Sequence, residues 1–117
     1  MKAFVISLIV LFSFVALTII NAIYINNVTA DFIEKAQGLS VGDCSVEDFI
    51  KGWEKHEPFI KISTSHKETH RIDEVLSVLE RKSKNHIKNG FDEERALLIE
   101  YLTQIKEDET VSLDSII

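Results

Sequence analysis

No charged side chain occurs between Lys2 and Asp31, and this stretch constrains the chain more than any other feature. Residues 3–20 are apolar apart from three hydroxyl side chains, and the next five residues extend the run. A hydrocarbon core of about 30 Å needs roughly 20 helical residues at a rise of about 1.5 Å each. Residues 3–25 are therefore predicted to cross a membrane as one helix, with Tyr24 at the interface.

A cleaved signal peptide is the alternative interpretation of the same stretch. Val28-Thr29-Ala30 has small residues at the −3 and −1 positions of a peptidase site, and cleavage there would make Asp31 the new N-terminus and release a secreted binding protein. The apolar run is longer than the usual signal-peptide core of about 7–15 residues, which favours an uncleaved anchor. A third interpretation, a buried helix of a soluble domain, is disfavoured because the run has no polar face.

The distribution of charge predicts which side of the membrane the rest of the chain occupies. Lys2 and the N-terminal amine precede the apolar run, whereas a mainly acidic segment begins at Asp31. The positive-inside rule then keeps the N-terminus in the cytoplasm. We predict a single-pass protein of a bacterial cell membrane, with residues 1–27 as the transmembrane anchor and residues 28–117 as one extracytoplasmic helical domain.

Composition restricts the partners of that domain. The chain holds 13 Lys and Arg against 19 Asp and Glu, and all of these charges except Lys2 follow the apolar run. Such an acidic domain lacks the basic surface that binds nucleic acid, so we expect no nucleic-acid partner. Cys44 is the only cysteine and can form no internal disulfide, so we expect a packed, partly buried thiol.

Glycine and proline positions divide residues 28–117 into four helical pieces. Residues 28–38 are expected to continue the anchor helix. Ser45 is expected to be the N-cap of a second helix, in which Pro58 introduces a kink or begins a new helix. The helical spacing places four apolar side chains on one face of this second helix: Val46, Phe49, Ile50 and Trp53.

Two amphipathic helices follow. The first begins near Ser65 and is expected to end at an Asn89-Gly90 C-cap; its apolar stripe comprises Ile72, Val75, Leu76, Leu79, His86 and Ile87. The second begins at Asp92, ends near Thr110, and buries Leu98, Tyr101, Leu102 and Ile105. Basic residues in 81–88 and acidic residues in 92–94 would face each other across the turn. The predicted fold is all-α: an N-terminal transmembrane helix followed by a small antiparallel helical bundle.

His66 and His70 form the one constellation with metal-ligand spacing. Imidazoles at i and i+4 share a helix face, and Asp73 or Glu74 lies one turn further along as a third ligand. Glu68 stands two residues after His66, however, which departs from the zinc-protease pattern, where the glutamate adjoins a histidine. We therefore treat these residues as candidates for a metal site and expect a structural role for the two histidines, with no cofactor and no catalytic activity.

Four apolar residues are candidates for contact with another protein. Trp53 and Phe59 are large aromatic side chains, although burial in the core of a small bundle is the more common role for such residues. Ile116 and Ile117 are apolar residues at the C-terminus, which either fold back onto the bundle or engage a partner. The functional hypothesis is a membrane-anchored module that acts through contacts with an unknown protein.

Together these features resemble a bacterial family of membrane-anchored proteins called domain of unknown function 4363. The matching residues are Trp53, His66, Ile72, Leu76, Leu79, Asp92, Leu98, Leu102, Ile105, Glu109 and Ser112-Leu113-Asp114-Ser115-Ile116-Ile117. The family commonly has Asn at the position of Ser115 and an aromatic residue at that of Ile117. The resemblance implies a membrane-anchored helical protein and assigns no activity or catalytic residue.

Overall fold

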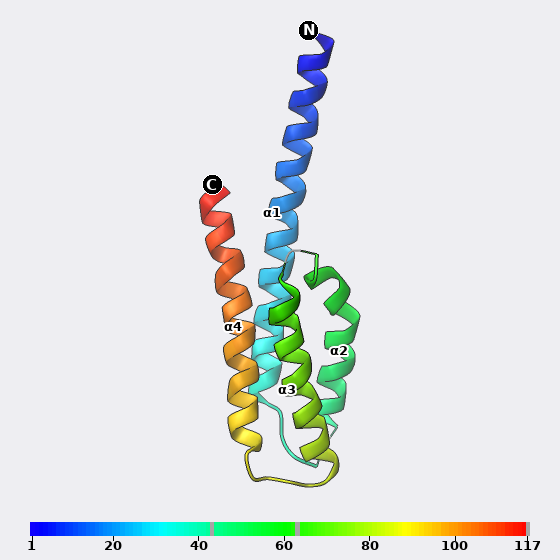
Figure 1. Cartoon of the computed structure of the whole chain (residues 1–117), viewed down its shortest axis with the longest axis vertical. Coiled ribbons are helices and arrows are strands. Elements are labelled where there is room, and N and C mark those ends of the chain that lie inside the picture. The colour runs from blue at the N-terminus through cyan, green and yellow to red at the C-terminus, as the bar shows by residue number, and fades with distance from the viewer. Residues whose placement is uncertain (43, 63, 117) are drawn as a thin grey trace.

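The computed structural model describes residues 1–42, 44–62 and 64–116, and for residues 110 and 112–116 it describes the helical backbone alone. The described residues form four helices: α1 (Lys2–Gln37), α2 (Ser45–Ile60), α3 (His66–Lys84) and α4 (Phe91–Ile116). Successive helices run in opposite directions, and α1 extends far beyond the other three (Figure 1). The predicted class, an all-α chain with a long apolar N-terminal helix and a small antiparallel bundle, is confirmed.

Helix α1 has two halves with different environments. In the first half most of the large apolar side chains from Phe4 to Ile20 are exposed, and the most apolar 18-residue window has a mean hydropathy of 2.9 with none of it buried. This half is long and apolar enough to cross a membrane. From Ala22 onward the same helix becomes part of the bundle core, and the expected continuation of the anchor helix through residues 28–38 is confirmed as far as Gln37.

Small residues characterise the bundle half of α1. Ala22, Thr29 and Ala36 are buried and lie seven residues apart, so they share one face of the helix. The Thr29 hydroxyl donates to the carbonyl of Ile25 at 2.6 Å, which satisfies this buried polar group within the helix. Side chains of this size let a neighbouring helix approach closely, and α1 packs most extensively against α4.

Aromatic side chains join α1 to α2. The Phe32 ring lies edge-on to Trp53, with 5.6 Å between centroids, and packs at 5.3 Å against Phe49. The predicted apolar faces are otherwise largely confirmed, and the buried members are Val46, Phe49 and Trp53 in α2, Ile72, Val75, Leu76 and Leu79 in α3, and Leu98, Leu102 and Ile105 in α4. Ile50 and Tyr101 are partly buried against this core.

Helix starts were predicted with mixed success. Ser65 is the N-cap of α3 and accepts a hydrogen bond from the Glu68 amide at 3.3 Å, as expected. The N-cap expected at Ser45 is wrong: Cys44 holds that position, and the Ser45 hydroxyl instead accepts from the Ser40 amide at 3.1 Å. Pro58 lies inside α2, which ends two residues later at Ile60, so it does not begin a new helix.

The C-terminus of α3 also differs from the prediction. The helix ends at Lys84, and His86 adopts a left-handed conformation with φ of 53°. The Ile87 amide donates to the Lys82 carbonyl and the His86 amide to the Ser83 carbonyl, which is a Schellman motif. His86 and Ile87 are therefore exposed turn residues rather than members of the buried stripe. Gly90 does have a positive φ, of 77°, but it precedes α4 instead of capping α3.

Helix α4 is longer than predicted. It begins at the buried Phe91 and continues to Ile116, so the end expected near Thr110 is wrong. The expected ion pairs across the α3–α4 turn are not found among the described residues: Lys84 pairs with Glu80 and Arg95 with Asp92, each within its own helix. The Arg95 guanidinium also donates to the Leu39 carbonyl at 3.0 Å and so connects α4 to the segment that follows α1.

Candidate functional site

The four metal-ligand candidates do not converge. His66 and His70 are both exposed near the start of α3. The His70 Nε2 atom lies 3.0 Å from Glu74 Oε1, whereas the Asp73 carboxylate accepts a hydrogen bond from Trp53 on α2. Among the side chains that the structure describes, no three His, Cys, Asp or Glu residues form a group able to hold a metal ion. The geometry gives the proposed histidine site no third ligand.

Trp53 is a core residue with a polar function of its own. Its side chain is 1% exposed, so the ring offers no surface to a partner, which corrects its place among the interaction candidates. The indole N–H lies 2.9 Å from Asp73 Oδ1 and 3.1 Å from Glu57 Oε2, and it donates to both. One donor thus links two carboxylates, one from α2 and one from α3.

A cleft of about 280 Å³ lies beside this arrangement, between α2 and α3. Four carboxylates belong to its lining: Glu54, Glu57, Asp73 and Glu80. Burial raises the pKa of Glu57, and both the hydrogen bond and the negative charge of Asp73 raise it further, while Lys61 and the Trp53 indole partly offset the effect. The surroundings of Glu57 thus make this carboxyl group easier to protonate than an exposed glutamate.

A second pair of carboxyl groups bridges α3 and α4. Burial and a hydrogen bond to Asp108 raise the pKa of Glu68, the charge of Asp108 adds to this effect, and Arg71 partly offsets it. Glu57, Asp73, Glu68 and Asp108 thus make two shared carboxyl contacts, and both involve the N-terminal half of α3. Protonation of these carboxyl groups would therefore affect how stably α2 and α4 pack on α3.

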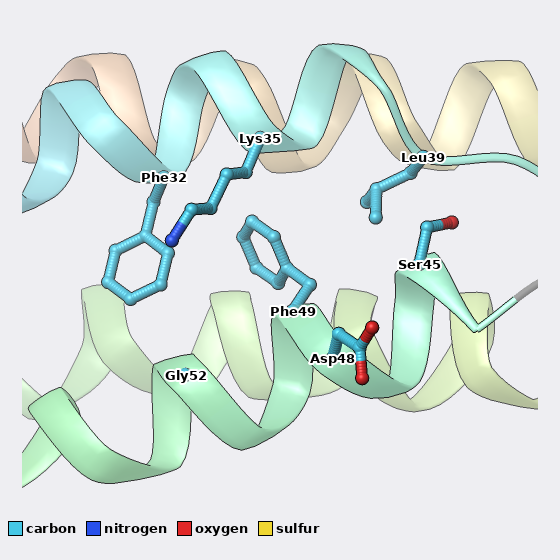
Figure 2. A pocket seen from close by; sticks show the side chains of 7 residues that line it. All are labelled: Phe32, Lys35, Leu39, Ser45, Asp48, Phe49 and Gly52. Atoms are coloured by element: carbon cyan, nitrogen blue, oxygen red, sulfur yellow. The ribbon is translucent and has the colours of Figure 1, made fainter.

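An apolar groove opens between α1 and the start of α2 (Figure 2). Its volume is about 240 Å³, and its lining consists of Phe32, Lys35, Leu39, Ser45, Asp48, Phe49 and Gly52. Gly52 lies in the floor, where an added Cβ would be 3.5 Å from the Phe32 ring. Lys35 pairs with Asp31 at 3.0 Å, and Asp48 is exposed at the rim. Phe32, Leu39 and Phe49 are each only 2–3% exposed, so the surface that the groove offers to another protein consists mainly of Lys35, Ser45 and Asp48.

Phe59 is the accessible aromatic residue among the interaction candidates. Its side chain is 55% exposed at the end of α2, and its ring meets Tyr24 edge-on with 6.3 Å between centroids. The Tyr24 hydroxyl and His56 Nδ1 are 2.6 Å apart and share a hydrogen bond. Leu17, Ile20 and Asn21 complete the lining of an open hollow of about 390 Å³ around Phe59 and Tyr24.

The remaining candidates lie at the C-terminus and at the start of α2. Ile117 and the side chain of Ile116 lie outside the part of the chain that the structure describes. Cys44 is exposed, which corrects the expectation of a partly buried thiol.

The chain was compared with known proteins. No family model, no curated protein and no solved structure matches it.

Sequence reasoning missed the contacts that define these sites. Asp73 was recognised only as a possible metal ligand, although its partner is the Trp53 indole. Tyr24 was placed at the membrane interface, but nothing in its spacing indicated His56, which is 32 residues away. The hydrophobic pattern did contain one usable signal, because Phe49 falls on the predicted apolar face of its helix, and it lines the groove in Figure 2 together with Phe32.

Proposed function

We propose that this protein is a membrane-anchored, extracytoplasmic helical module that acts through protein–protein contacts and has no catalytic activity of its own. The observation that carries the proposal is the continuity of α1, which exposes an apolar half and packs its other half into the bundle. A helix without a break between the two halves would hold the bundle in a fixed position at the membrane surface. The span in this proposal is the apolar part of α1 that precedes Ala22, because Ala22 and Ile25 are buried in the bundle.

The packing of α1 favours an anchor that is retained. Ala30 follows the buried Thr29 directly, and Ala22 and Ile25 are also part of the core. Cleavage after Ala30 would remove these buried side chains and expose the face of α4 against which α1 packs. A secreted fragment of residues 31–117 would therefore be destabilised, which weighs against the cleaved-signal alternative.

The groove between α1 and α2 is the contact surface that we propose. Phe32 and Phe49 are buried, so the accessible lining is chiefly Lys35, Ser45 and Asp48, and the exposed carboxylate of Asp48 suits a basic residue of a partner. The expected occupant is thus a segment of a partner protein that presents Lys or Arg to Asp48. The resemblance to domain of unknown function 4363 is consistent with this role, and we propose membership of that family.

Orientation can be tested with Cys44, because it is exposed and is the only cysteine. A membrane-impermeant thiol reagent should label the full-length protein in intact cells, with a Cys44→Ser variant as the blank. Labelling that occurs only after lysis would place the bundle in the cytoplasm and contradict the proposed topology. The intact mass of the same purified sample shows whether the chain begins at Met1 or at Asp31.

Photo-crosslinking tests the contact surface. A benzophenone amino acid at position 48, on the groove rim, should give a discrete adduct in native membranes, and the same group at the exposed Lys67 of α3 should not. Gly52→Leu fills the groove and should abolish the adduct. Equal adducts from positions 48 and 67, or an adduct that persists in Gly52→Leu, would refute the groove as the binding site.

A further inference from the structure

Exposed apolar side chains of the bundle gather at the end from which α1 projects. After residue 30, the large hydrophobic side chains that the structure shows as exposed are Phe59, Ile62, Ile87 and Val111. Phe59 and Ile62 stand at the end of α2, and Val111 stands near the end of α4. Figure 1 shows the end of α2 beside α1 and the end of α4 reaching further along the free half of α1, whereas the α3–α4 turn that holds Ile87 is at the opposite end of the bundle.

Contacts with Tyr24 show which part of α1 lies beside this apolar surface. Phe59 touches Tyr24 with 6.3 Å between ring centroids, and His56 is hydrogen-bonded to the Tyr24 hydroxyl. The end of α2 therefore lies at the height of Tyr24, one turn beyond the exposed Ile20. The bundle and the apolar half of α1 thus meet at this level.

The length of the apolar half of α1 places Tyr24 and the end of α2 near the edge of a bilayer. A hydrocarbon core of about 30 Å takes up roughly 20 helical residues, so a span that begins at Ala3 ends close to Ala22. Ala22 is also the first residue of α1 that is buried in the bundle. Little or no free helix is left between the hydrocarbon and the bundle, and the bundle end must lie in the interfacial layer.

The chemistry of the surface suits that layer. The hollow formed by Leu17, Ile20, Asn21, Tyr24 and Phe59 has a volume of about 390 Å³ and faces the apolar half of α1. Aromatic residues with one polar edge are favoured at interfacial depth. The acidic residues Glu107 and Asp108 lie about one turn from Val111, so anionic lipid headgroups would not be attracted to this end.

We propose that the bundle end formed by Phe59, Ile62 and Val111 is a second membrane contact, which inserts into the bilayer interface and lets lipid acyl chains fill the hollow beside Phe59. This inference rests on the proposed membrane span in the apolar half of α1. The contact is apolar and does not depend on anionic lipid. It would restrict rotation and tilt of the bundle, because the module is then held at α1 and at the ends of α2 and α4.

Spin-label accessibility tests the contact in the full-length protein. In a Cys44→Ser background, single cysteines replace Ile62, Val111, Ile87 or Leu11, all of which are exposed, and each carries a nitroxide. The protein is reconstituted in phosphatidylcholine vesicles, with and without phosphatidylglycerol. The ratio of oxygen to nickel-chelate accessibility should be several-fold higher at positions 62 and 111 than at position 87, in both lipids.

The control positions separate the two proposals. Leu11 lies within the proposed span and should give the highest ratio, whereas Ile87 should give an aqueous value. A lipid-like value at position 11, combined with a value at position 62 or 111 equal to that at position 87, would overturn the second contact and leave the anchor intact. An aqueous value at position 11 would overturn the anchor and the inference that rests on it.

Discussion

The Tyr24 hydroxyl and His56 Nδ1 lie 2.6 Å apart and join α1 to α2 at the end of the bundle that carries Phe59. The contact is partly buried, and the Tyr24 and His56 rings are 6.1 Å apart between centroids. A hydrogen bond in such a site is shielded from water, so it specifies how α2 docks on α1. This pair therefore couples the helix proposed to cross the membrane to the first helix packed against it.

Loss of this hydrogen bond should destabilise the bundle measurably. Tyr24→Phe removes the hydroxyl and leaves the ring in place, so the free energy of unfolding should fall by about 0.5–1.5 kcal/mol. Denaturant unfolding of the full-length protein in detergent, followed by circular dichroism, provides the measurement. Tyr101→Phe is the matched control, because Tyr101 is also partly buried and should change stability by less than about 0.5 kcal/mol. Equal effects of the two variants would contradict the role of Tyr24.

The Trp53 indole should be energetically coupled to Asp73. Trp53→Phe removes the donor that bridges Asp73 and Glu57, and Asp73→Ala removes one acceptor. In a double-mutant cycle the coupling energy should be about 0.5–3 kcal/mol. Glu74→Ala is the control, since this neighbouring carboxylate binds His70 instead; its effect should add to that of Trp53→Phe within about 0.3–0.5 kcal/mol. Additivity in both cycles would show that the indole does not bind Asp73 in solution.

The helices and their inner faces were predictable because they follow local rules. Apolar residues at helical spacing in α2, α3 and α4 are buried as expected, with Trp53, Leu76 and Leu102 as examples. The Ser65 cap was also predictable, since a serine three residues before Glu68 supplies an acceptor for a free helix amide. These signals act over one or two turns and require no knowledge of the tertiary structure.

The errors arise where tertiary contacts override local preference. The end of α4 was expected at Thr110, but no Gly or Pro follows Phe91 to stop the helix, and α1 offers a long surface for it to pack along. At the end of α3, His86 takes the left-handed position that Gly90 was expected to hold. His86 packs against Gly42, where an added Cβ would be 3.1 Å from its Nδ1 atom, so a contact between two turns accompanies the earlier stop. The contacts of Tyr24, Trp53 and Phe59 join separate helices, so no pattern within one or two helical turns of the sequence predicts them.

The contribution of Glu57 and Glu68 to stability should fall as the pH rises above about 4.5. Burial and the neighbouring carboxylates raise the pKa of Glu57 and of Glu68 in the folded state above the ordinary glutamate value of about 4.5. Between 4.5 and the raised pKa values the folded state binds more protons than the unfolded state, so these two groups make unfolding easier with increasing pH. Unfolding of the wild-type protein and of Glu57→Gln and Glu68→Gln should be followed across this range.

The substitutions isolate the contribution of each carboxyl group. Glu57→Gln and Glu68→Gln should each gain stability relative to the wild type as the pH rises, because each removes a charge that the folded state disfavours. Glu34→Gln changes an exposed glutamate on α1 and should keep a constant difference from the wild type. A constant difference for Glu57→Gln and Glu68→Gln as well would show that the two carboxyl contacts do not form.

Close packing of α1 should make Ala36 intolerant of a larger side chain. Ala36 is fully buried, and it lies on the same face of α1 as Ala22 and Thr29. Ala36→Leu would force α1 away from the neighbouring helices and should lower the free energy of unfolding by about 1–3 kcal/mol. Gln37→Leu introduces the same side chain at the adjacent exposed position and should change stability by no more than about 0.5 kcal/mol. A similar small change in both variants would mean that the bundle half of α1 packs loosely, and the rigid link between membrane span and bundle would then be lost.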